Sequence, residues 1–174
     1  MSTRFFSLIV AASVVVVALT SAFLTLPRAE AQGVSSQVIT NYLDRMGVTW
    51  RRQSSDPNAF IVTKTTGLSR ADRVELIVTN LAKDDLVTLR AYPQVGGKYL
   101  ALSGSGDQRG LTKAMLEKNS MAFGAYFIDE DGDIGFRYVF TTESGLGFEA
   151  FKVAVTELLR IADDAAVSLY NRYR

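Results

Sequence analysis

The amino-acid sequence predicts an α+β fold in which helices pack on one face of an antiparallel sheet. Three observations predict it. Segments with apolar residues at helical spacing lie near both ends of residues 32–174, runs rich in β-branched and aromatic residues lie between them, and short polar turns join successive runs. The predicted element order is α-β-β-β-(β)-α-β-β-α, within one domain of residues 32–174.

The first 31 residues have the pattern of an export leader. Residues 5–23 carry no charge, Arg4 precedes them, and Ala29 and Ala31 fit the A-x-A pattern that a signal peptidase reads. Cleavage after Ala31 makes Gln32 the first residue of a periplasmic or secreted protein. Because residues 5–23 are also long enough to span a bilayer, an uncleaved N-terminal membrane anchor is the alternative. Both alternatives place the domain outside the cytosol.

The composition of the remaining domain excludes several classes of function. Residues 32–174 contain 17 basic and 17 acidic residues, so no overall field favours a nucleic-acid partner. The chain has no cysteine, which excludes disulfides and thiolate chemistry. It also has no histidine, which removes the Ser-His-Asp and Cys-His arrangements and the commonest metal ligand. We therefore expect no catalytic residues, no metal site and no cofactor.

The first predicted helix covers residues 34–46. One stripe of this helix carries apolar residues at spacings of three and four, namely Val34, Val38, Ile39, Tyr42, Leu43 and Met46. Ser35 or Ser36 is a suitable N-cap, and Gly47 is a suitable end.

The next predicted elements are extended. Strands are expected at residues 50–52, 59–65, 74–81 and 86–92, with a short extended piece at 99–102. Pro93, Gly96 and Gly97 are expected to end the fourth run. Within that run Val87 and Leu89 alternate with polar residues, which predicts one buried and one wet face of the sheet.

Two helices and a hairpin complete the predicted fold. Asp107 is a plausible cap for a helix that reaches about Ala122, with Leu111, Met115 and Ala122 inward. Residues 123–128 and 134–141 are expected to form a hairpin. A long amphipathic C-terminal helix follows, and its inward residues are Phe148, Phe151, Val155, Leu158, Ala162, Ala165, Leu169 and Tyr173.

Two segments resemble ligand sites but fail the motif tests. Counted from Asp129, the acidic segment Asp129–Asp133 has Ile134 and Phe140 where an EF-hand calcium loop needs Gly and Glu. Asp and Gly also favour a tight turn, so we expect a plain hairpin turn rather than a cation site. The glycine-rich residues 104–110 match neither a P-loop nor a dinucleotide fingerprint, so we interpret them as a connector.

Other polar clusters are expected to be surface features. Asp84-Asp85 is predicted in a turn, and Asp163-Asp164 on the solvent face of the last helix. Five further residues could bind an anionic ligand, but we interpret them as scattered positions of a strand and a loop: Trp50, Arg51, Arg52, Arg70 and Arg73.

From Val34 to about Tyr173 the chain resembles the YbjN family, whose fold is similar to that of type III secretion chaperones. The most telling segments are Leu116-Glu117-Lys118-Asn119, Phe123-Gly124-Ala125-Tyr126-Phe127-Ile128, Asp129-Glu130-Asp131-Gly132-Asp133-Ile134, and the final helix with Phe151, Leu158 and Ala162. The resemblance implies a regulator of sensory transduction without established catalytic residues. By analogy of fold it also implies protein binding.

We therefore expect an exported, non-catalytic module of the cell envelope. It binds a protein partner, or it binds another copy of itself to form a homodimer. In this interpretation the chain meets a membrane only through residues 5–23, if they are not cleaved. The alternative is a carboxylate-based hydrolase or an envelope glycan-binding protein, with Trp50, Tyr92 and Tyr99 as stacking surfaces.

Overall fold

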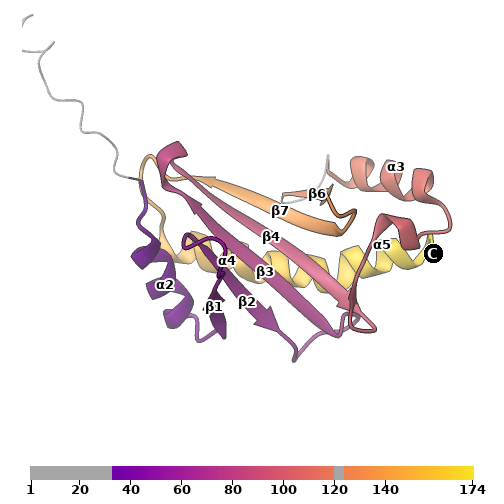
Figure 1. Cartoon of the computed structure of the whole chain (residues 1–174), viewed down its shortest axis with the longest axis horizontal. Coiled ribbons are helices and arrows are strands. Elements are labelled where there is room, and N and C mark those ends of the chain that lie inside the picture. The colour runs from indigo at the N-terminus through magenta and orange to yellow at the C-terminus, as the bar shows by residue number, and fades with distance from the viewer. Residues whose placement is uncertain (1–32, 120–123) are drawn as a thin grey trace, which may run out of the picture. The chain divides into compact units, whose positions relative to one another are not determined.

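The computed structural model describes residues 33–119 and 124–174 (Figure 1), which belong to one compact unit. Its centre is a seven-stranded antiparallel sheet with the order β1-β2-β3-β4-β7-β6, and β5 pairs with β4 outside this order. The strands are β1 (Trp50–Arg52), β2 (Ala59–Lys64), β3 (Arg73–Leu81), β4 (Leu86–Val95), β5 (Lys98–Tyr99), β6 (Ala125–Ile128) and β7 (Ile134–Thr141).

The helical segments lie before, between and after the strands. They are α2 (Ser36–Arg45), α3 (Gln108–Asn119), α4 (Phe148–Arg160) and α5 (Val167–Asn171), with a π-helical segment (Ile161–Ala166) joining α4 to α5 and 3-10 turns at Ala82–Asp84 and Leu102–Gly104. Figure 1 shows α4 running along one side of the sheet. The α+β architecture with helices on one sheet face was predicted from the sequence and is confirmed.

The hydrophobic core lies between that sheet face and the helices. Because side chains alternate along a strand, every second residue of β2, β3, β4 and β7 points toward the helices. These residues pack against α2 and α4 in one cluster whose largest fully buried members are Phe60, Phe136, Phe151, Ile39, Leu43, Leu76, Leu89, Leu111, Ile134 and Leu158. Leu111 and Met115 of α3 join the same cluster, as the sequence predicted.

Pro93 lies inside β4, so the prediction that it ends the strand is wrong. The Gln94 carbonyl accepts a hydrogen bond from the Asp72 N–H on the β3 side, so the nitrogen of Pro93 faces the opposite side. On that side the pairing of β4 with β7 stops at Ala91. The ring is tolerated because no β7 residue pairs with β4 at this position.

Several element boundaries also differ from expectation. Five strands separate α2 from α3 rather than three or four, because residues 98–99 pair with the end of β4 across the turn at Gly96 and Gly97. Ser35 occupies the N-cap position of α2 without a capping side-chain hydrogen bond. Gly47 ends that helix with a φ of 66°, as predicted. The expected inward residue Ala122 lies outside the described residues.

The C-terminal helix is not a single regular α-helix, because its middle is π-helical. A π-helical turn takes in more residues than an α-helical one, so it rotates the following residues about the helix axis. The predicted inward residues Ala165 and Tyr173 are only half-buried, whereas Asp163, Ala166 and Tyr170 are buried. The π-helical segment therefore shifts the buried stripe of the helix, and Asp163 becomes part of this stripe.

No helix within residues 33–119 and 124–174 is both long and apolar enough to cross a membrane. The predicted leader, its cleavage site at Ala29 and Ala31, and the expected first residue Gln32 lie outside the described residues.

Candidate functional site

In residues 33–119 and 124–174, no helix packs on the sheet face opposite α2 and α4. We call it the open face, and its residues are Arg51, Ala59, Ile61, Thr63, Arg73, Glu75, Ile77, Thr79, Leu81, Leu86, Thr88, Arg90, Tyr92, Gln94, Tyr99, Ala125, Phe127, Gly135, Arg137, Val139 and Thr141. None of the apolar residues of this face belongs to the core cluster. Both faces of the sheet therefore carry apolar side chains, but within the described residues helices cover only one of them.

Exposed apolar side chains concentrate on the open face. Of the five large hydrophobic residues exposed in the described part of the chain, Leu81, Tyr99 and Val139 belong to it, and Val139 is 45% exposed. The face carries aromatic, aliphatic, threonine and arginine side chains, one glutamine, one glutamate and no lysine. This composition is typical of the centre of protein–protein interfaces, where aromatic residues and arginine are enriched and lysine is depleted.

Two arginines face each other across the middle of the open face. Arg90 of β4 and Arg137 of β7 are directly opposite in the strand register. Like charges in such positions are destabilising. Neither guanidinium has a carboxylate ion pair within the described residues, and the buried Nε of Arg90 has no hydrogen-bond partner. The arrangement favours a carboxylate-bearing partner that would lie over both guanidinium groups.

A cavity of about 610 Å³ lies between the two arginines and the acidic turn. Tyr92 and Phe127 meet edge to face in its wall, with ring centroids 5.5 Å apart. Gly135 makes room for this contact, because a Cβ at its position would lie 2.7 Å from the Phe127 ring. Burial, together with a hydrogen bond to Asp129, raises the pKa of Tyr92, so the phenol is neutral at physiological pH.

Tyr99 extends the aromatic end of the open face. Its ring lies 5.9 Å from that of Tyr92, and its hydroxyl donates a hydrogen bond to the Glu75 carboxylate. Burial, followed by this hydrogen bond, raises the pKa of Tyr99 to about 12. Trp50 is not part of this surface. It packs edge to face on Phe60 and donates a hydrogen bond to Asp44 over 2.8 Å, so the three predicted stacking aromatics do not form one platform.

The acidic segment Asp129–Asp133 forms the hairpin turn between β6 and β7. The Asp129 carboxylate accepts the backbone N–H groups of Asp131 and Asp133 over 3.1 and 2.9 Å. Gly132 has a φ of 84°, a conformation that favours glycine. Burial, and then the charges of Asp129 and Asp131, raise the pKa of Asp133. The carboxylates follow one another along one turn, and in residues 33–119 and 124–174 no three acidic side chains are arranged to hold a metal ion.

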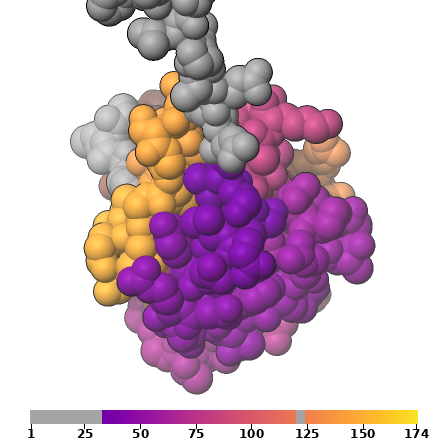
Figure 2. All heavy atoms as spheres, turned by 90° about the vertical axis from the view of Figure 1, so that its left-hand side faces the viewer, coloured from indigo at the N-terminus to yellow at the C-terminus, as the bar shows by residue number. Residues whose placement is uncertain are grey.

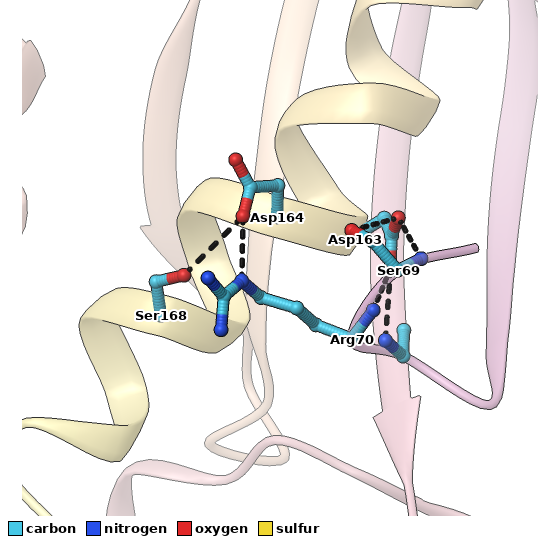
Figure 3. A network of polar contacts seen from close by, with 6 residues as sticks. Ser69, Arg70, Asp163, Asp164 and Ser168 are labelled. Atoms are coloured by element: carbon cyan, nitrogen blue, oxygen red, sulfur yellow. Dashed lines mark hydrogen bonds and ion pairs between the residues drawn. The ribbon is translucent and has the colours of Figure 1, made fainter.

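Asp163 contradicts the prediction that the Asp163-Asp164 pair is a solvated surface. It lies in the π-helical segment, is only 6% exposed, and accepts hydrogen bonds from the loop before β3 (Figure 3). The donors are the Ser69 N–H (2.7 Å) and hydroxyl (3.0 Å), the Arg70 N–H (2.9 Å) and the Ala71 N–H (2.8 Å). Burial by itself raises the pKa of Asp163, but these hydrogen bonds outweigh it and hold the pKa below its ordinary value.

Asp164 is half-buried and pairs with the Arg70 guanidinium at 2.6 Å, and Ser168 lies one helical turn further along (Figure 3). Arg73 pairs with Glu75 at 3.7 Å, and Arg52 stacks on the Phe60 ring at 4.9 Å. The predicted arginines are therefore used separately, as the sequence interpretation expected, and do not form a common anion site.

The glycine-rich residues 104–110 connect the 3-10 turn to α3. The Asp107 carboxylate accepts the Gly110 N–H over 2.8 Å and caps the helix, as predicted. The Ser105 hydroxyl donates to the Tyr173 carbonyl over 2.6 Å, and a Cβ at Gly104 would lie 2.3 Å from the Tyr170 hydroxyl. The connector therefore packs closely against the C-terminal helix. This close packing accounts for its small residues, and a phosphate-binding role is not needed to explain them.

A second hollow, the cationic groove, lies between α2, β2 and α4 on the helical side of the sheet. Its volume is about 740 Å³, and it is lined by the cations Arg45, Lys64 and Lys152, by five threonines and by no acidic residue. The buried side chains of Val62 and Leu159 lie at its base. Figure 2, which faces α2, shows the indigo surface of the N-terminal described segments bordering the orange and yellow surface of α4.

Sequence reasoning missed both the buried Asp163 and the cationic groove. The groove collects residues from three segments far apart in the chain, and no local pattern links them. No local signal marked Asp163, because regular helical geometry turns it by about 100° from the inward Ala162.

No protein-family model and no curated protein matches the chain. Among solved structures, the chain is similar to one described as the crystal structure of the ExsC–ExsE complex, with a TM-score of 0.53 and 16% sequence identity. The alignment covers 78% of this chain and 92% of that one. The similarity shows the fold, and it confirms the predicted α+β architecture of an antiparallel sheet with helices on one face.

Proposed function

We propose that this chain is an exported, non-catalytic, protein-binding domain of the cell envelope, and that the open face is its binding surface. The observation that carries the proposal is a sheet face with exposed apolar side chains and a pair of facing arginines, neither of which forms an ion pair within the described residues, although the acidic turn lines the same cavity. The partner it fits is a polypeptide that presents apolar side chains around at least one carboxylate.

The similarity to a solved structure of a protein complex supports a role in protein binding. The resemblance to the YbjN family supports a regulatory role of the sensory-transduction type. The A-x-A pattern at Ala29 and Ala31 supports export. If the partner is a second copy of the chain, the open faces of two copies meet around a two-fold axis.

Site-directed photocrosslinking tests the binding surface in native cells. The full-length chain carries a benzoylphenylalanine in place of Tyr99, and the crosslinked products are identified by mass spectrometry. We expect a discrete polypeptide adduct that is lost in Val139→Asp, because a charge in the interface must be desolvated. The matched control is Val153→Asp, which makes the same change at a valine on α4 that is 56% exposed, and it should leave the adduct intact.

The absence of any Tyr99 adduct, or equal adducts in the two aspartate variants, would contradict the open face as the binding surface. Export is tested separately by N-terminal sequencing of the protein from its native cells. A start at Gln32 is expected for a cleaved leader, and an intact N-terminus in the membrane fraction for an anchor. An intact chain in the cytosol would contradict export.

A further inference from the structure

We propose that the cationic groove is a second docking site, and that it takes an acidic segment of a partner polypeptide other than this chain. This inference rests on the proposed protein-binding function but concerns a different surface. The groove opens on the helical side of the sheet, whereas the open face is on the other side.

Charge complementarity identifies the kind of occupant. Arg45, Lys64 and Lys152 converge on one hollow from α2, β2 and α4, and no carboxylate lines it. The guanidinium of Arg45 is held over the Phe148 ring, 3.7 Å from its centroid, so it is oriented before any partner arrives. Within the described residues, only one of the three cations forms an ion pair: the Lys152 ammonium lies 3.9 Å from the Glu149 carboxylate on the surface of α4. The groove thus concentrates positive charge although the domain as a whole is close to neutral.

The apolar base and the threonines favour a polypeptide over a small anion. Val62 and Leu159 at the base would contact an aliphatic side chain, and the threonine hydroxyls could hydrogen-bond to a peptide backbone. A cavity of about 740 Å³ is also much larger than an inorganic anion requires. The occupant is therefore a segment with two or more carboxylates and at least one apolar side chain.

On the β1 side of β2, no strand of the described part of the chain pairs with the residues beyond Val62. The register of β1 with β2 ends at Trp50 and Val62, and only the Thr63 N–H continues it, by donating to the Thr49 carbonyl over 3.2 Å. Lys64 and the two threonines that follow it therefore reach the groove from an open strand edge, which can be approached by an extended segment.

Photocrosslinking from inside the groove tests this assignment on the full-length chain. Benzoylphenylalanine replaces Thr156, an exposed residue of α4 that lines the groove. We expect crosslinked peptides rich in Asp and Glu. The charge-reversal pair Lys64→Glu and Lys152→Glu should lower the yield about tenfold, because like charges would then face each other across the contact. A comparable loss is expected at high salt.

The matched control reverses two exposed lysines of α3 that lie neither in the groove nor on the open face, Lys113→Glu and Lys118→Glu, and should change the yield less than about twofold since distant charges are screened. Thermal unfolding by circular dichroism shows that each variant is folded. Neutral or basic crosslinked peptides, an adduct to another copy of this chain, or equal loss in both charge reversals would overturn the inference.

The crosslinker at Tyr99 separates the two proposals. An adduct at Tyr99 with none at Thr156 leaves the proposed function standing and removes the groove as a docking site. Absence of adducts at both positions overturns both proposals.

Discussion

The two faces of the same sheet differ in what their side chains do. On the covered face, Phe60, Leu89 and Phe136 are fully buried against the helices. On the open face, Val139 is exposed, and Arg90 lies directly opposite Arg137. Both faces are made by the same strands and alternate residue by residue. The residues of the covered face therefore stabilise the fold. The exposed residues of the open face have an arrangement that the stability of the fold does not explain.

This contrast teaches how a binding surface can be recognised without a motif. On the covered face, burial explains the large apolar residues, since each of them belongs to the core cluster or packs against it. Exposed apolar groups and two arginines in directly opposite positions are unfavourable in the isolated domain. A bound partner is the simplest source of the missing contacts.

The largest expected effect is on the covered face. Leu158→Ala removes a fully buried side chain in the last turn of α4 and should lower the free energy of unfolding by roughly 3 kcal/mol, measured by urea denaturation. The control, Val153→Ala, truncates an exposed residue of the same helix and should change it by less than about 0.5 kcal/mol. Similar losses in both variants would mean that α4 does not cover the sheet as described.

The second largest effect is expected at Asp163. Asp163→Asn replaces a carboxylate that accepts four hydrogen bonds by an amide that cannot accept all of them. The free energy of unfolding should fall by roughly 2 kcal/mol. Asp164→Asn is the control, since its pair with Arg70 is half exposed and contributes little, below about 1 kcal/mol. An unchanged stability of Asp163→Asn would show that the loop is held by other contacts.

The same carboxylate predicts a pH dependence. The folded-state pKa of Asp163 lies below that of the unfolded chain, which is about 4. Its stabilisation is therefore present at neutral pH and is lost as the pH falls below about 4 and through the folded-state pKa. Asp163→Asn should remove this component, so the stability difference between wild type and variant should shrink in acid.

The sequence predicts most of the fold because periodicity is a local property. The alternation around Val87 and Leu89, the hairpin at Asp129–Asp133 and the apolar stripe of Phe151 and Leu158 can each be recognised in a short window. Pro93 was placed wrongly because its tolerance depends on where the pairing with β7 stops, which is a tertiary property.

The candidate site is harder to predict for the same reason. The opposition of Arg90 and Arg137 depends on the register of two strands that are more than 40 residues apart in the chain. The burial of Asp163 depends on a π-helical turn, and regular helical counting places this residue outside the buried stripe. Neither fact follows from the composition of any single segment.

A smaller effect of opposite sign is expected at the arginine pair. Arg137→Glu places a carboxylate directly across from Arg90 and should raise the free energy of unfolding by about 0.5 kcal/mol, since a like-charge pair becomes an opposite-charge pair. The same variant should lose the Tyr99 crosslink, because the guanidinium that faces the partner is replaced by a negative charge. If Arg137→Glu is more stable but binds less, Arg137 serves binding rather than the stability of the fold. Reduced stability would instead show that Arg137 supports the fold.

The smallest effect is expected at Tyr99, at the edge of the open face. Its pKa is about 12, raised by burial and then by the hydrogen bond to Glu75. The unfolded chain titrates near 10. The neutral phenol therefore stabilises the folded protein below about pH 10, and this contribution disappears as the pH rises toward 12. Glu75→Gln should lower the pKa of Tyr99 but leave it above the ordinary value, because burial remains.

The titration of this one tyrosine is isolated as the difference between ultraviolet pH titrations of each protein and its Tyr99→Phe counterpart. If the pKa of Tyr99 is unchanged in Glu75→Gln, the hydrogen bond does not order this edge of the open face. If a bound partner covers the same edge, the further burial should raise the pKa again. The Tyr99 titration thus reports directly whether the open face of the sheet is covered in the complex.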